Sequence, residues 1–150
     1  MKPLKTTLKV IKQIALQESQ GKLLIQSEER QKKLGEVFTP TSLVLDILTK
    51  LPTGLNGVWQ EGKTFLDPAC GNGQFLAAIL IIKIQCEHKN PLSSIFGVDI
   101  MEDNVIACRK RLFEIIKTTN PTKEELKTSF KLLKKNIVCA DGLTYDYEFK

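Results

Sequence analysis

The segment Asp67-Pro-Ala-Cys-Gly-Asn-Gly73 constrains the fold of this chain more than any other. It follows a short apolar run at residues 63–67 and precedes the strongly apolar residues 75–82. That second run is far shorter than the roughly 18 to 20 residues needed to cross a bilayer, so no membrane span is predicted. Two glycines allow a tight turn and a close approach of the backbone to a ligand. The pattern predicts a buried strand, a glycine turn and a buried helix over about residues 75–87.

The same alternation of strand and helix continues along the chain. Residues 94–99 predict a second strand, and residues 102–117 predict an amphipathic helix. Residues 136–141 predict a third strand, and residues 145–149 the beginning of a fourth. Alternating strands and helices predict an α/β fold with a mostly parallel sheet and helices on both faces.

Two helices are predicted from their end signals. Thr39 is the expected cap of a helix with Pro40 at its first position, and Pro52 ends that helix. Thr122 and Glu125 have the spacing of a capping box. The helix that this box begins has an expected apolar face made of Leu126, Phe130, Leu133 and Ile137.

The N-terminal residues 1–34 are expected to form a helical arm of two short helices, ahead of a domain over residues 35–150. The net charge of this 150-residue chain is +5, but it is uneven. Residues 1–35 hold eight basic and three acidic side chains, and residues 109–135 hold nine and three. These segments could bind phosphate backbones, or they could be solvated helix faces.

Cysteine and histidine content argues against a metal site. The four cysteines form no CxxC pair, and His88 is the only histidine, so a structural zinc site lacks ligands. The apolar stretches near the N-terminus are too short for a signal peptide. We therefore expect a cytoplasmic protein with reduced thiols and no bound metal.

Three predicted strands end on an acid, at Asp67, Asp99 and Asp141. The carboxyl ends of parallel strands are where open α/β folds bind ligands. A P-loop would need Gly-Lys-Ser/Thr, and the dinucleotide fingerprint would need glycine where Leu76 stands. An acid before the glycine turn suits a cation, an acid closing the second strand suits ribose hydroxyls, and Asp141 suits an adenine amine. S-adenosylmethionine combines these groups without phosphate.

Four segments, in this order, resemble adenine-specific (N6) DNA methyltransferases of the restriction-modification and phage type. They are Val37-Phe-Thr-Pro40, Asp67-Pro-Ala-Cys-Gly-Asn-Gly-Gln-Phe-Leu76, Gly97-Val-Asp-Ile100 and Ala140-Asp-Gly-Leu143. The resemblance covers residues 35–143 and implies a Rossmann-like S-adenosylmethionine-dependent methyltransferase fold with an incomplete sheet.

The resemblance also implies a cofactor site. Thr39 would contact the methionine carboxylate, and the loop from Asp67 to Gly73 would hold the methionine amine and the ribose. Asp99 would bind the ribose hydroxyls, and Ile100 would pack on adenine. The implied cofactor-binding set is Phe38, Thr39, Asp67, Pro68, Ala69, Cys70, Gly71, Gly73, Phe75, Asp99, Ile100, Asp141 and Gly142.

Each of these assignments has a plainer alternative. Asp67 and Asp99 could cap their own loops, and Phe75 could belong to the core. Cys70 follows a strand and precedes a helix, where thiolates are favoured. The sequence offers no partner base for it, so we do not assign it as a nucleophile.

The family's catalytic motif, Asn/Asp-Pro-Pro-Tyr/Phe, does not occur in the sequence, whose six prolines all stand singly. No catalytic residue is therefore assigned, and the chain is expected to be inactive alone, as the cofactor-binding portion of a truncated methyltransferase domain. Expected partners are DNA and a second chain or C-terminal half that carries catalysis. Two alternatives remain: a non-catalytic subunit of a modification complex, or a methyltransferase of RNA, protein or a small molecule.

Overall fold

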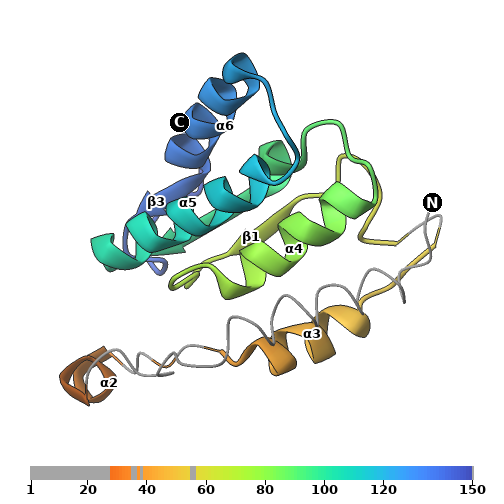
Figure 1. The fold of residues 1–150 in the computed structure, drawn as a ribbon. Coiled ribbons are helices and arrows are strands. Elements are labelled where there is room, and N and C mark those ends of the chain that lie inside the picture. The colour runs from red at the N-terminus through yellow and green to blue at the C-terminus, as the bar shows by residue number, and fades with distance from the viewer. Residues whose placement is uncertain (1–27, 35–36, 38, 55–56, 150) are drawn as a thin grey trace.

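The computed structural model describes residues 28–34, 37, 39–54 and 57–149. The first helices are α2 (Glu28–Leu34) and α3 (Thr41–Thr49). The remaining elements, in chain order, are β1 (Phe65–Asp67), α4 (Gln74–Gln85), the 3-10 helix η1 (Pro91–Ser94), β2 (Ile95–Asp99), α5 (Glu102–Lys117), α6 (Lys123–Asn136) and β3 (Ile137–Cys139) (Figure 1). The predicted helical arm lies outside the described residues except for α2.

The three strands form one parallel sheet in the order β1-β2-β3. Asp67 pairs with Gly97, and Asp99 pairs with Cys139, so the strands end at one edge of the sheet. The predicted α/β class with a parallel sheet flanked by helices is confirmed, and the arrangement is Rossmann-like. Among the described residues, no helix is long and apolar enough to cross a membrane.

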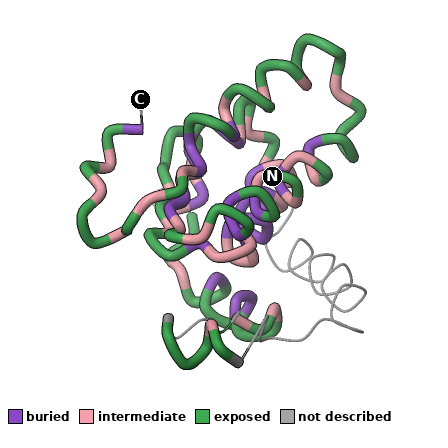
Figure 2. The backbone as a smooth tube through the Cα atoms, turned by 90° about the vertical axis from the view of Figure 1, so that its left-hand side faces the viewer, coloured by how far each residue is buried: buried purple, intermediate pink, exposed green. Residues whose placement is uncertain are grey.

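Helix α4 is the centre of the core. It is apolar on all sides, as expected of a helix surrounded by other elements, and it contacts α3, α5, β1 and β2. Leu76, Leu80 and Ile82 are fully buried there. Buried positions accordingly gather where α4 meets the strands (Figure 2). The loop that precedes α4 is therefore anchored at both ends by well-packed elements.

A buried lysine ties the other ends of β1 and β2 together. Lys83 lies on α4 and is fully buried. Its Nζ donates to the backbone oxygen of Lys63 at 2.8 Å and to Oγ of Ser94 at 2.9 Å, and it lies 5.0 Å from the centre of the Phe65 ring. Burial lowers the pKa of this amine. Two oxygens and one aromatic face thus hold a cation that the apolar pattern of the helix did not predict.

Helix α3 begins later than predicted. Pro40 has an extended ψ of 140°, so it is the cap and Thr41 is the first helical residue. The carbonyl of Pro40 accepts the first helical hydrogen bond, from Val44 at 3.1 Å, and no side chain caps the helix. The predicted capping role of Thr39 is therefore wrong.

The predicted capping box of α6 is confirmed. The Thr122 hydroxyl accepts from the backbone N–H of Glu125 at 3.2 Å, and the Glu125 carboxylate accepts from that of Thr122 at 2.7 Å. The predicted apolar face is only partly right, because Phe130 is 51% exposed and Ile137 belongs to β3.

Residues 145–149 form no strand, so that prediction is wrong. Tyr147 and Phe149 have φ values of 57° and 45°, which an extended strand cannot accommodate. The Tyr147 hydroxyl donates to the carbonyl of Gly142, which turns the segment back on itself. Phe149 instead packs against Phe96 of β2, with ring centres 4.7 Å apart.

Candidate functional site

The loop between β1 and α4 is held in a tight turn by backbone hydrogen bonds, one of them to β2. The N–H of Cys70 donates to the carbonyl of Val98 at 2.8 Å, and the N–H of Gly73 donates to the carbonyl of Cys70 at 2.8 Å. Gly73 has a φ of 85°, and a Cβ there would lie 2.6 Å from Sγ of Cys108. Only glycine satisfies both the dihedral angle and the close approach of α5.

Asp99, at the end of β2, accepts three hydrogen bonds. Its Oδ2 accepts from the N–H of Gly71 at 2.8 Å, and its Oδ1 accepts from the N–H of Met101 at 2.9 Å and from Nδ2 of Asn104 at 3.2 Å. The carboxylate therefore caps the glycine loop and the approach to α5, as the plainer interpretation of this residue expected. A carboxylate has about four lone-pair positions, so about one remains for a ligand unless a protein donor turns away.

Asp67, at the end of β1, is the second acid of the site. Its Oδ1 accepts from the N–H of Ala69 at 3.2 Å, which is a local capping contact. Burial raises the pKa of Asp67, the hydrogen bond from Ala69 lowers it, and the charge of Asp99 raises it further. A cation beside these two acids would relieve both the burial cost and the repulsion.

These residues line a pocket of about 210 Å³, smaller than the roughly 300–1,000 Å³ of typical small-molecule sites. Among the described residues, its walls carry two acids and no lysine or arginine. The Asn72 side chain also contributes a buried Oδ1 that accepts no hydrogen bond. The lining residues are Val37, Thr39, Asp67, Ala69, Cys70, Gly71, Asn72, Gln74, Phe75, Asp99, Ile100, Met101 and Asn104.

Eight residues of the implied cofactor set therefore meet at one pocket, from Thr39 to Ile100. Pro68, Gly73, Asp141 and Gly142 lie outside its lining, and Phe38 lies outside the described residues.

The segment after β3 lies beside the pocket. Oδ1 of Asp141 accepts from the N–H of Leu143 at 2.9 Å, so this acid caps its own turn. The N–H of Ala140 donates to the carbonyl of Asp99 at 3.0 Å, and Gly142 lies against the carbonyl of Pro68. Asp141 therefore stands at the edge of the glycine loop, where its side chain is exposed.

Cys70 has no sign of activation. Its hydrogen bond with Cys108 and its burial raise the pKa of its thiol. A thiol in this state is a poor nucleophile at neutral pH. In the part of the chain that the structure describes, no cluster of histidine, cysteine, aspartate and glutamate could hold a metal ion.

Five lining residues are absent from the implied cofactor set. They are Val37, Asn72 and Gln74, which stand within the quoted segments, and Met101 and Asn104 beyond β2. The signal for Asn104 is its place in the first turn of the helix that follows an acid-terminated strand, since short polar side chains there readily reach back to the preceding turn.

One of the comparisons with known proteins gives a match. The family described as N-6 DNA Methylase matches residues 22–133, which is more than half of the chain. That match includes α3, the glycine loop, Asp99 and α5, and ends before Asp141. No curated protein and no solved structure matches the chain.

Proposed function

The chain belongs to the N-6 DNA methylase family, and we propose that its pocket binds S-adenosylmethionine for methylation of the exocyclic amine of adenine in DNA. The observation that carries the proposal is the charge of the pocket, whose described walls hold two carboxylates and no basic side chain. A ligand with phosphates would be repelled by these carboxylates. S-adenosylmethionine has an adenine and a ribose, carries an ammonium and a sulfonium against one carboxylate, and has no phosphate, so its net charge is positive.

The residues of the pocket fit this donor at its methionine end. The buried Oδ1 of Asn72 lacks a donor, and the carboxyl of Asp67 is partly desolvated beside a second acid. An ammonium supplies both a hydrogen-bond donor and a positive charge to such groups. The Thr39 hydroxyl, which caps no helix, is available to donate to the methionine carboxylate.

The remaining contacts concern the nucleoside end. Asp99 would accept from a ribose hydroxyl with its remaining lone pair. Ile100, which is 56% exposed at the pocket, would pack on the adenine ring, with Phe75 nearby. We propose that Asp141 and Gly142 complete the adenine side, because a pocket of about 210 Å³ holds only part of a nucleoside-sized ligand.

When bound, S-adenosylmethionine supplies an activated methyl group on a positively charged sulfur. The residues of this chain would hold S-adenosylmethionine, and the two carboxylates of the pocket would balance its positive charge. Orienting the target amine requires a further group, and the sequence contains no Pro-Pro dipeptide with which to form the family's catalytic motif. We therefore propose that the chain does not methylate DNA alone, and that a second chain or a C-terminal half supplies this motif. The absence of this motif is also what the alternative function predicts, that of a non-catalytic subunit that binds the cofactor.

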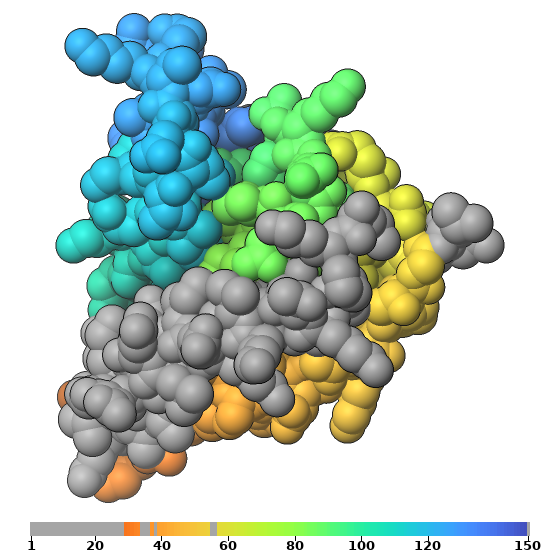
Figure 3. All heavy atoms as spheres, turned by 45° about the vertical axis from the view of Figure 1, so that its right-hand side comes forward, coloured from red at the N-terminus to blue at the C-terminus, as the bar shows by residue number. Residues whose placement is uncertain are grey.

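The surface of α6 supports a role in DNA binding. This helix projects from the body of the molecule (Figure 3). Its exposed lysines are Lys123, Lys127, Lys131, Lys134 and Lys135. Of these, Lys127 contacts Glu124, and Lys134 lies over the exposed ring of Phe130. Such a helix would contribute attraction to phosphates that weakens with salt.

Titration calorimetry with S-adenosylmethionine tests the cofactor assignment. Asp99→Ala should weaken binding by about 2–3 kcal/mol, because it removes a charged acceptor and releases the glycine loop. Asp99→Asn is the milder variant, and thermal unfolding verifies that each variant is folded. Asp46→Ala is the matched control, because it removes an exposed acid of α3 outside the pocket. Equal affinity of the Asp99 variants and the Asp46 control would overturn the assignment.

A further inference from the structure

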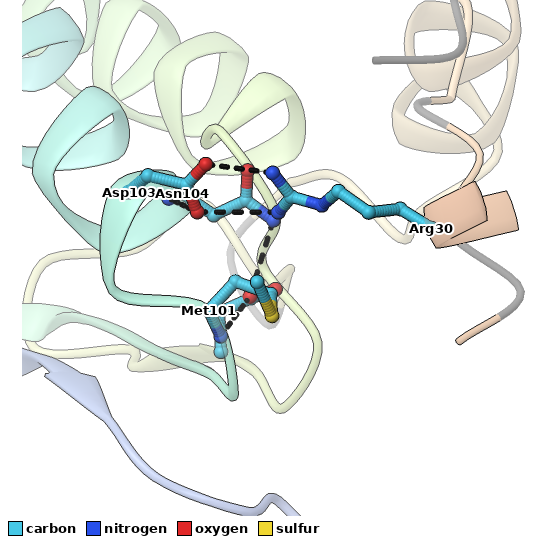
Figure 4. A network of polar contacts seen from close by, with 5 residues as sticks. Arg30, Met101, Asp103 and Asn104 are labelled. Atoms are coloured by element: carbon cyan, nitrogen blue, oxygen red, sulfur yellow. Dashed lines mark hydrogen bonds and ion pairs between the residues drawn. The ribbon is translucent and has the colours of Figure 1, made fainter. Parts of the chain in front are cut away.

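The helix α2 is tied to the first turn of α5 by an ion pair. Arg30 donates from Nη1 to Oδ2 of Asp103 at 2.6 Å and from Nη2 to Oδ1 at 3.1 Å. Figure 4 shows the guanidinium reaching across from α2 to Asp103, beside Asn104 and Met101. A bidentate pair of this kind fixes both the distance and the orientation of the two elements.

This pair differs from the other described ion pairs. The Arg30 side chain is only 18% exposed, whereas both side chains of the Lys33–Glu29 pair on the same helix are more than 70% exposed. It also joins residues distant in the sequence, while the others lie within one turn of a helix. The Arg30 side chain holds the pKa of Asp103 below its ordinary value, so the carboxylate stays ionised. The geometry is therefore that of a tertiary contact rather than of a solvated helix pair.

Asp103 belongs to the network that shapes the pocket. Its Oδ1 also accepts from the N–H of Asn104 at 2.9 Å, and Asn104 donates from Nδ2 to Asp99. Asn104 and Asp99 both line the pocket. The ion pair therefore ends on the wall that carries the acid assigned to the ribose.

Another part of the pocket lining comes from the chain that follows α2. Val37 and Thr39 line the pocket, and they lie between α2 and α3. Thr39 therefore stands between two held elements, α2, which the ion pair ties to α5, and α3, which packs on α4. Val37 is 53% exposed, so it buries little apolar surface that could hold this part of the chain if the ion pair were lost.

We propose that Arg30 and Asp103 are positioning residues for the cofactor site, which hold its two walls at the separation that bound S-adenosylmethionine requires. The inference rests on the proposed function, because it assumes that the ligand is S-adenosylmethionine. It adds to that function a coupling between the helix α2 and the affinity of the pocket. By the reciprocity of linked equilibria, binding of S-adenosylmethionine also strengthens the docking of α2 on α5.

The test compares S-adenosylmethionine binding to the wild-type chain, Arg30→Ala, Asp103→Ala and the double variant. Each single variant should weaken binding about three- to tenfold, and the double variant should weaken it no further than either single variant. Arg30→Lys should restore part of the affinity, because lysine keeps the charge and loses the bidentate geometry. Lys33→Ala is the matched control, since it removes the same charge from α2 without breaking a contact to α5.

Salt separates positioning by this ion pair from a general loss of structure. Raising ionic strength should narrow the difference between wild type and Arg30→Ala, because screening weakens the pair in the wild type alone. If the wild type binds and Arg30→Ala binds equally well, this inference is refuted and the proposed function stands. If a folded wild-type chain binds no S-adenosylmethionine, the proposed function is refuted and this inference with it.

Discussion

The substitution Gly73→Ala tests how α5 shapes the glycine loop. Gly73 has a φ of 85°, where an L side chain costs about 1–2 kcal/mol. The added Cβ would also meet Sγ of Cys108 at 2.6 Å, Cβ at 3.2 Å and Cα at 3.3 Å. Overpacking of this kind costs about 1–3 kcal/mol. The variant should therefore lose about 2–5 kcal/mol of unfolding free energy.

Gly62 separates the two causes. Its φ of 81° is nearly the same, but a Cβ there would have no atom within 4 Å. Gly62→Ala should therefore cost only the dihedral strain of about 1–2 kcal/mol. In a Cys108→Ala background the sulfur contact is gone, and the cost of Gly73→Ala should fall by at least about 1 kcal/mol toward that of Gly62→Ala.

Urea denaturation followed by Trp59 fluorescence measures these costs. Trp59 is the only tryptophan, it is buried, and it stacks on Phe65 at the start of β1, with ring centres 5.1 Å apart. A Gly73→Ala variant within 0.5 kcal/mol of the wild type, an estimated limit for neutral surface changes, would refute the reasoning. An equal cost of Gly73→Ala with and without the Cys108 sulfur would refute the contact argument alone.

Three further outcomes are expected. Arg111→Ala should weaken cofactor binding about three- to tenfold in calorimetry, because Arg111 donates to the loop carbonyl of Asn72 at 3.0 Å. Arg109 instead donates to the carbonyl of Ile137 at the start of β3, so the control Arg109→Ala should lower stability but leave the affinity unchanged. Burial raises the pKa of Asp67 above its ordinary 3.8, so ionising this carboxyl costs more in the folded chain than in the unfolded one. The unfolding free energy of the wild type, measured by urea titration, should therefore fall relative to that of Asp67→Asn as the pH rises from about 4 to 7. A difference in unfolding free energy that does not change with pH would contradict this. Thr122→Ala should cost about 1 kcal/mol in thermal unfolding, and an unchanged midpoint would count against the capping box.

Local signals in the sequence predicted the elements that surround the loop. The helix Glu102–Lys117 was predicted with its observed bounds, because an acidic first turn and an amphipathic period mark it clearly. The capping box of Thr122 and Glu125 is equally local and was also correct. Features whose cause lies within one or two turns of the chain are thus readable from the residues alone.

Contacts between distant segments could not be predicted in this way. Nothing near Lys83 in the sequence shows that the carbonyl of Lys63 and the hydroxyl of Ser94 will receive its amine. Likewise, the failure of the expected strand at 145–149 involves packing of Phe149 on the ring of Phe96, which lies more than 50 residues earlier in the chain. The hydrogen bond that Asp99 accepts from Gly71, which lies 28 residues away, is of the same kind.

The most direct test of the central claim is to titrate the wild-type chain with S-adenosylmethionine and, at the same ionic strength, with adenosine triphosphate. The two ligands share adenine and ribose and differ in the charge of the group attached to them. An acidic pocket without basic side chains in its described walls predicts saturable binding of S-adenosylmethionine and no measurable binding of the triphosphate. Equal or tighter binding of the triphosphate, or no binding of S-adenosylmethionine by the folded chain, would contradict the account.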